Sequence, residues 1–286
     1  MYFFDPHIHC YSRTTDDYER MALAGIRVVN EPSFWLGQPR TSVGTFIDYF
    51  ETLIGWERFR AAQYGIKHVC TMALNPKEAN DPRVQGVLEI LPEYLQKDGV
   101  VGVGEIGYDD MTKAEEHCFI AQLQMAEKAG LPVIIHTPHR DKKNGVQRTI
   151  DTVKDLKLTE KMIVIDHNTE ETVQMVKDQT DCWAGHTMYP QTKMSIDRAV
   201  KIVKRYGVNK MLFNSSADWG QSDPLNVPKF AFELRKTHEP DEHIEQLLWF
   251  NPLAFFEQSG KLDISNLDVD ERDPMALFEG NSILRN

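Results

Sequence analysis

Histidine and carboxylate side chains recur in this sequence directly after short apolar segments. They begin with His7 and His9 and continue as single residues along most of the chain: Glu105, His136, His167 and Asp218. Four imidazoles and two carboxylates suit borderline dications such as zinc, manganese or iron, whereas magnesium and calcium prefer shells made of oxygen. The residue types therefore predict a site for two divalent metal ions, with zinc as the first choice and manganese or iron as alternatives.

The pair His7 and His9 is weak evidence when taken alone. A chain with 10 histidines among 286 residues is expected to contain roughly 0.3 such pairs by chance. The context adds weight, because residues two apart in a strand point the same way. Both imidazoles should therefore project together from the end of a first strand.

Apolar segments typical of buried strands alternate with helical stretches along the chain. The segments are 2–8, 26–30, 66–74, 100–106, 131–136, 162–166, 182–186 and 211–215. Eight such strands, each followed by a helical stretch, predict a parallel sheet closed into a (β/α)8 TIM barrel, with an open doubly wound sheet as the alternative. Thr112 with Glu115 forms a capping-box signal for one helix, and Gly130 should end it.

The candidate ligands all fall where a predicted strand ends. Glu105 and His136 end the fourth and fifth strands. His167 follows the sixth strand and Asp218 follows the eighth. The carboxyl ends of parallel barrel strands share one face, so these side chains should converge. The competing interpretation, hydrogen-bonded core or capping residues, explains each residue singly but not their common position.

Composition is that of a globular protein with a substantial core, with 41% hydrophobic and 26% charged residues. We expect one domain over residues 1–286, with the tail from about 263 to 286 wrapping the outside. The four cysteines form no CxxC pair, the N-terminus lacks the features of a signal peptide, and no apolar run is long enough for a membrane span. These features predict a cytoplasmic protein without a membrane partner, and they indicate no particular oligomeric state.

The net charge of −11 disfavours a broad basic surface that grips many phosphates. A small-molecule substrate is the favoured partner, and nucleic acid is possible but not favoured.

The sequence resembles the TatD-related branch of the metal-dependent amidohydrolase superfamily. The resemblance covers nearly the whole chain and is carried by FFDPHIHCY, VVGVGEIGYDD, FIAQLQMAEKAGLPVIIHTP, VIDHN, LFNSSADWG and WFNPLAFFEQSGKL. It implies that His7, His9, Glu105 and Asp218 bind one metal. It also implies that Glu105 bridges to a second metal, which His136 and His167 complete.

The chain departs from the family's pattern beside the ligands. SADWG at 216–220 replaces an acidic-Thr-Asp-x-Pro run, NTE at 168–170 replaces a Phe-Ser-Gly-like segment, and PHR at 138–140 stands where an Arg usually follows the fifth-strand histidine. The family's DNase activity is therefore expected to transfer poorly.

Five further residues are candidates for substrate binding. They lie in the loop after the fifth strand, at the end of the seventh strand, and in or beside the long loop after the second: His139, Arg140, His186, Glu31 and Arg40. Loops over the top of a barrel usually set specificity. A solvated surface loop and a minor aromatic core are the competing interpretations.

The leading hypothesis is a hydrolase that uses metal-activated water on a small ester, amide or phosphoester. Asp218 would act as the general base. The alternatives are a TatD-like deoxyribonuclease acting on nucleic-acid ends and, from another class, a non-catalytic metal-binding scaffold.

Overall fold

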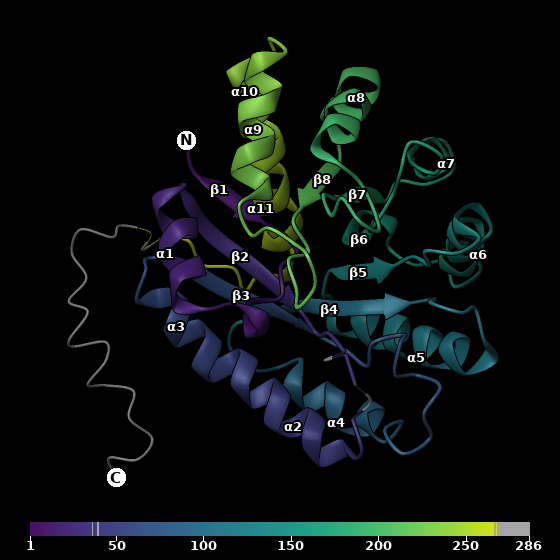
Figure 1. The fold of residues 1–286 in the computed structure, drawn as a ribbon. Helices are drawn as coiled ribbons and strands as arrows, with labels where there is room; N and C mark the ends of the chain where they lie inside the picture. Colours follow the sequence, from purple (N-terminus) through teal and green to yellow (C-terminus); the bar gives the residue numbers. More distant parts are fainter. Residues whose placement is uncertain (36, 39, 266, 268–286) are drawn as a thin grey trace.

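The computed structural model describes residues 1–35, 37–38, 40–265 and 267, which are built around a sheet of eight parallel strands (Figure 1). The strands lie side by side in sequence order: β1 (Phe3–Asp5), β2 (Ile26–Pro32), β3 (Lys67–Met72), β4 (Val100–Gly107), β5 (Val133–His136), β6 (Ile163–Ile165), β7 (Trp183–Thr187) and β8 (Met211–Asn214). Each pairs in parallel with the next. This order forms a nearly closed (β/α)8 barrel and confirms the predicted fold class, because an open doubly wound sheet reverses its strand order.

The first and last strands are joined just beyond their carboxyl ends. The Ser216 N–H donates to the carbonyl of His7 at 2.7 Å, and the His9 N–H donates to the carbonyl of Ala217 at 2.9 Å. The segment that carries the two histidines is therefore fixed although β1 itself has ended. The predicted first strand was longer, and Pro6 explains the difference, because proline has no N–H to donate to a neighbouring strand.

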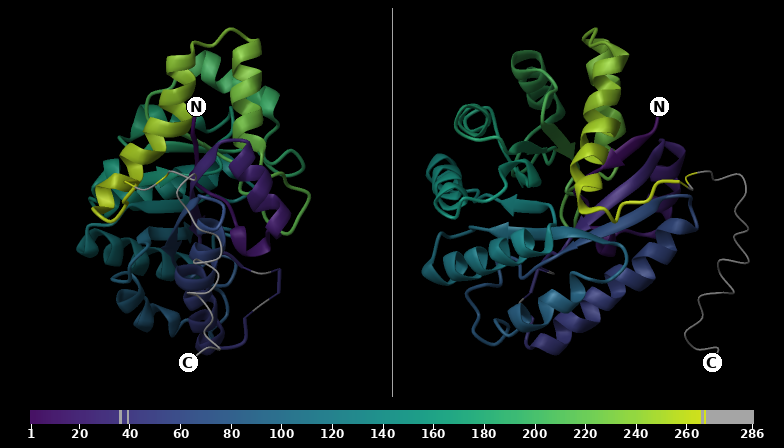
Figure 2. Two further views of the ribbon diagram at one scale, coloured as in Figure 1. Left: turned by 90° about the vertical axis from the view of Figure 1, so that its left-hand side faces the viewer. Right: turned by 180° about the vertical axis from the view of Figure 1, so that it is seen from behind.

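Helices surround the sheet, as the two views in Figure 2 show. They are α1 (Thr15–Leu23), α2 (Val43–Thr52), α3 (Arg58–Ala62), α4 (Val87–Tyr94), α5 (Lys113–Ala129), α6 (Lys142–Asp155), α7 (Val173–Gln179), α8 (Ile196–Tyr206), α9 (Asn226–Lys236), α10 (Asp241–Glu245) and α11 (Asn251–Phe256). Buried apolar side chains between this layer and the strands form two large clusters. Burial on both faces explains why the strands appear in the sequence as continuous apolar runs.

The helix α5 begins and ends where the sequence predicts. The Thr112 hydroxyl accepts from the Glu115 N–H at 3.1 Å, and Gly130 ends the helix with a left-handed φ of 64°. The Glu115 carboxylate instead accepts from three backbone N–H groups of the preceding loop, Asp109 to Met111. This fixes the loop after β4, which carries Asp109 toward the carboxyl end of the barrel.

The interior of the barrel is filled by one side chain from every strand, and α11 covers it. The cluster comprises Phe4, Val28, Val69, Val101, Ile134, Val164, Trp183, Leu212, Leu253, Phe255 and Phe256. Phe256 stacks on Phe4 of the first strand with ring centroids 5.4 Å apart. The barrel is therefore a packed core rather than a pore, and a site for ligands must lie at its rim.

The predicted arrangement of the tail, 263–286, falls mostly on residues outside those described. Of that segment only 263–265 and 267 are described, and Ile264 and Leu267 pack against the interior cluster near α11. None of the described helices combines the length and the apolar character that a membrane span requires.

Candidate metal centre

The imidazoles of His7 and His9 face each other at the carboxyl end of the barrel. Their Nε2 atoms lie 3.1 Å apart, and both side chains are buried. Asp166, directly after β6, lies 2.7 Å from Nδ1 of His7. Because a carboxylate accepts, the proton of His7 belongs on Nδ1, which leaves Nε2 as a ligand atom.

Glu105 lies between two other imidazoles. Its Oε1 atom is 3.0 Å from Nδ1 of His136, 2.9 Å from Nε2 of His167 and 3.9 Å from Nε2 of His7. These side chains come from β4, from β5, from the residue that follows Asp166 and from the segment after β1. The structure thus brings five of the six predicted ligands together, and Glu105 is at their centre.

Backbone conformation and hydrogen bonds on the side away from Glu105 fix the orientation of His167. Its φ of 61° is left-handed, which is uncommon outside glycine, and its N–H donates to Oδ1 of Asp166 at 2.7 Å. Its Nδ1 lies 2.7 Å from the hydroxyl of Thr187, which donates to Oδ1 of Asn214 at 2.8 Å. The hydroxyl has a single proton, so it accepts from Nδ1–H of His167. Nε2 therefore faces Glu105 with a lone pair.

One contact of the cluster joins two lone pairs and is therefore suited to a cation: Nε2 of His167 meets a carboxylate oxygen of Glu105. Beside it, the lone pair on Nε2 of His7 points at Nε2 of His9. Among the described residues, Nδ1 of His9 and Nε2 of His136 are buried without a hydrogen-bond partner. Buried polar atoms rarely stay unpaired, so imidazole and carboxylate donors in this arrangement fit divalent metals.

Electrostatics agree with this fit. Burial lowers the pKa of His9 and of His167 well below the usual 6.5, so both rings are neutral near pH 7 and keep a lone pair. Burial alone would raise the pKa of Glu105, but the neighbouring imidazoles of His7 and His136 outweigh it and hold that pKa well below its usual range. The carboxyl is therefore a carboxylate, the form that binds metal.

The sixth predicted ligand, Asp218, stands slightly apart. It lines a cavity over the cluster together with Glu105 and His167, but its Oδ1 accepts from the Tyr189 hydroxyl at 2.9 Å and from the Gly220 N–H at 2.8 Å. Its backbone carbonyl accepts from Arg13. Asp218 belongs to none of the ligand clusters formed by the described residues.

The cavity over the cluster has a volume of about 190 Å³. The loop after β2 covers it, because Phe34 stacks on His9 with ring centroids 3.9 Å apart and Trp35 lines the wall. Lys77 lies over the Trp35 ring and pairs with Asp109 at 2.8 Å. Aromatic and charged groups from the loops after β2, β3 and β4 therefore surround the cavity.

Of the five candidate substrate contacts, His139 alone lines a described cavity. Arg140 points into solvent and pairs with Asp110, and the buried Arg40 pairs with Glu78 at 2.6 Å. Two further candidates are buried away from the cavity.

The first of these, Glu31, lies 2.8 Å from Nε2 of His68, and burial raises the Glu31 pKa to about 8. The second, His186, stacks on Phe213 with ring centroids 4.6 Å apart, and burial lowers its pKa to about 4. Both therefore have structural partners of their own.

Among the residues of the site that were not identified from the sequence, three contact the proposed ligands or their support. Asp166 supports His7, Asn214 donates to Asp166 at 3.1 Å, and Lys193 lies 3.3 Å from Nε2 of His167. The first had a visible signal, a carboxylate directly before a predicted ligand. The lysine lies beyond β7 in a loop where no spacing identifies it.

Comparison with known proteins identifies the family. The sequence profile of a family described as TatD related DNase matches residues 4–256. The chain belongs to this family. An uncharacterized metal-dependent hydrolase of Methanocaldococcus jannaschii is 26% identical over 256 residues, which cover 88% of this chain and 98% of the relative. The TatD-family chain is thus a metal-dependent hydrolase.

Solved structures agree on the architecture. A TatD-like protein of Archaeoglobus fulgidus superposes with a TM-score of 0.76 at 25% identity, over 89% of this chain and all 100% of that chain. A phosphotriesterase homology protein of Escherichia coli, solved with phosphate in its active site, superposes with a TM-score of 0.65 at 14% identity, over 89% and 98% of the two chains. The second likeness is one of fold.

Proposed function

We propose that this TatD-family chain hydrolyses an ester, amide or phosphoester bond in a small molecule with two divalent metal ions, zinc first among them. The observation that carries the proposal is the meeting of unprotonated acceptors at 2.9 Å between Glu105 and His167, beside the facing rings of His7 and His9. When bound, the ions would lower the pKa of a water molecule toward neutrality and polarise the bond under attack.

The proposed ligands form two sets that share Glu105: His7, His9 and Asp218 for one ion, His136 and His167 for the other. The short distances from Oε1 of Glu105 to both His136 and His167, and its 3.9 Å approach to His7, support a shared carboxylate. Asp166 and Thr187 keep the ligand nitrogens of His7 and His167 unprotonated and aimed inward.

Asp218 is the proposed general base. Both described hydrogen bonds to its carboxylate, from Tyr189 and Gly220, go to Oδ1. Oδ2 is then the oxygen to take a proton from water and pass it to the leaving group. Such a transfer contributes about 10²–10⁴ to the rate.

A small substrate is favoured by the size of the cavity and by the net charge of the chain. The cavity of about 190 Å³ is covered by Phe34 and Trp35, and the net charge of −11 opposes a long polyanion. All four cysteines are free and buried, which supports the cytoplasmic location that we propose.

Elemental analysis of the purified protein, followed by a panel of chromogenic phosphodiesters, esters, lactones and amides, tests the proposal. We expect two metals per chain and turnover of at least one small substrate, with both lost in Glu105→Ala. That variant also separates true turnover from a contaminating hydrolase. Two bound metals without turnover on any class would favour the non-catalytic scaffold instead.

The second candidate is cleavage of nucleic-acid ends, which the family's description as TatD related DNase favours. Its signature would be shortening of a single-stranded DNA 3′ end, stopped by chelator and weakened steeply by salt. Comparing the rates on DNA and on the small-substrate panel decides between the two.

A further inference from the structure

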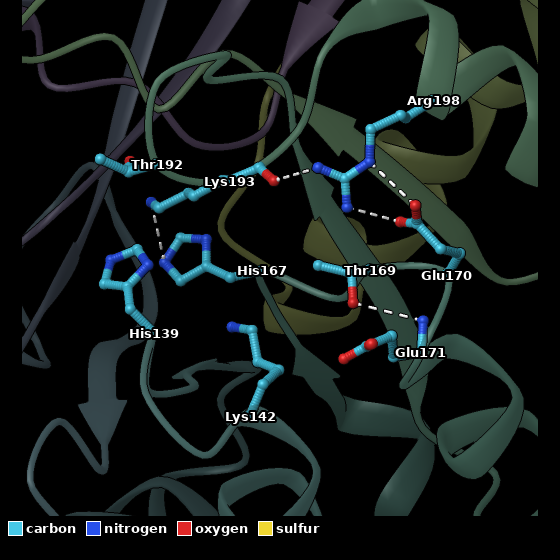
Figure 3. A pocket seen from close by; sticks show the side chains of 9 residues that line it. All are labelled: His139, Lys142, His167, Thr169, Glu170, Glu171, Thr192, Lys193 and Arg198. Atoms are coloured by element: carbon cyan, nitrogen blue, oxygen red, sulfur yellow. Dashed lines mark hydrogen bonds and ion pairs between the residues drawn. The ribbon is translucent and has the colours of Figure 1, made fainter.

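A second cavity adjoins the metal centre and has a volume of about 330 Å³ (Figure 3). It shares His139, His167, Thr192 and Lys193 with the first cavity. Its walls come from the loops after β5, β6 and β7, so it extends sideways from the metal centre along the top of the barrel. A group bound there would lie beside a bond held over the metal ligands.

Two lysine side chains enter this cavity from opposite sides. In Figure 3, Lys193 and Lys142 both reach toward the ring of His167. The Lys142 ammonium donates to the hydroxyl and the carbonyl of Thr137 at 2.9 and 3.2 Å. The Lys193 ammonium lies 3.3 Å from both Nε2 of His167 and the Ser216 hydroxyl. All of these partners are neutral.

Neither lysine has a carboxylate partner within 4.0 Å among the residues that the structure describes. The cavity's other cation, Arg198, is already neutralised by Glu170 through two bonds of 2.9 and 2.7 Å. Glu171 is exposed at the outer rim. The inner part of the cavity therefore faces two uncompensated ammonium groups.

Confining two cations without counter-charge is unfavourable. Burial, and after it the charge of Lys193, lower the pKa of Lys142 to about 7. The carboxylates of Glu105, Asp166 and Asp218 favour the charged form of Lys193 from distances beyond 4.0 Å. An anion between the two ammonium groups would supply the missing charge.

We propose that this second cavity is a subsite for a compact oxyanion of the substrate, a phosphate or a carboxylate, held between Lys142 and Lys193. The inference rests on the proposed function, since it places the anion next to the bond that is hydrolysed. It narrows the substrate class to small molecules that carry a negatively charged group beside the scissile bond.

Binding of inorganic sulfate to the metal-loaded protein, measured by titration calorimetry at constant ionic strength, tests the subsite without turnover. Sulfate keeps its charge over the working pH range and is a weak ligand for zinc. Lys142→Gln keeps a donor for Thr137 but removes the charge, so we expect at least about 10-fold weaker sulfate binding. Lys142→Arg should retain most of the affinity. Lys143→Gln, the adjacent exposed lysine of α6, is the matched control and should bind like the wild type.

Acetate in a parallel titration distinguishes a carboxylate subsite from one that prefers a tetrahedral oxyanion. Equal sulfate affinity in wild type and Lys142→Gln, or no binding by folded wild type, would overturn the subsite. Lys193→Met, with its metal content measured, gives a second and independent loss of charge. Lysine-dependent binding in a protein that hydrolyses nothing would leave the subsite standing and refute the proposed function. Turnover of a small substrate together with sulfate binding that does not depend on the lysines would support the proposed function and refute the subsite.

Discussion

Replacing Asp166 by asparagine should weaken metal binding without touching a proposed ligand. The carboxylate of Asp166 accepts from Nδ1 of His7 and from the N–H of His167, both at 2.7 Å, and from the amide of Asn214 at 3.1 Å. Asparagine turns one of its two oxygens into a donor. If that donor faces His7, the proton of His7 must move to Nε2, and the ligand atom is lost. If it faces the N–H of His167, two donors collide.

The size of the effect follows from this choice. Either arrangement removes one oriented ligand or one buried backbone hydrogen bond. Loss of such supporting partners typically lowers metal affinity about 10- to 100-fold, which corresponds to about 1.4–2.7 kcal/mol. Because the first arrangement blocks a ligand atom outright, we expect the upper end of this range for Asp166→Asn.

Competition with a chromophoric chelator on demetallated protein measures the change in zinc affinity. Asp151→Asn, an exposed residue of α6 bonded to Gln147, is the matched control and should change nothing. Gly185→Ala perturbs the same carboxylate from β7, because a Cβ there would collide with Asp166. Unchanged zinc affinity in Asp166→Asn that is folded by circular dichroism would refute the orienting role.

Three other predictions concern the metals, the proton and the buried acid. Glu105→Ala should lose both metals, whereas His136→Ala should mainly empty one site. Elemental analysis measures the metal content, and equal content in Glu105→Ala and wild type would contradict a shared carboxylate. Asp218→Asn should keep its metal while kcat falls at least about 10²-fold, least for substrates with good leaving groups; rescue by added zinc would reject the proton-transfer role. Burial raises the pKa of Glu31 from 4.5 to about 8. Between these two pH values the unfolded chain has released the Glu31 proton and the folded chain still holds it. The free energy of unfolding therefore falls as pH rises through this range, by at most about 1.4 kcal/mol per pH unit. Glu31→Gln, which can still donate to His68, should therefore lose less unfolding free energy than wild type between pH 6 and pH 8 in urea titrations, and equal losses would argue against a buried neutral acid.

The fold was predictable because the strands are buried on both faces and appear as apolar runs of the right number and order. The convergence of Glu105, His136 and His167 followed from the same topology. The geometry that joins His7 to His9 did not follow from the topology. The strand β1 ends at Asp5, and backbone hydrogen bonds to other segments position both rings.

The substrate candidates depended on register and loop geometry, which the sequence does not reveal. His186 ends the predicted seventh strand and lies one residue before the end of β7, but the twofold alternation of side chains turns it toward Phe213 rather than toward the site. Arg140 and Lys142 are two residues apart in one basic segment, yet the first points into solvent and the second into a cavity. Charge alone could not separate them.

The position of α11 has a consequence for how this protein is made. Phe255 and Phe256 fill the interior that all eight strands enclose, and Phe256 stacks on Phe4 from the start of the chain. Interior side chains of the first strands therefore lack their packing partners until residue 256 has left the ribosome. Nascent chains that stall before that point would expose a ring of apolar side chains, and they are the species that chaperones and proteases would meet first.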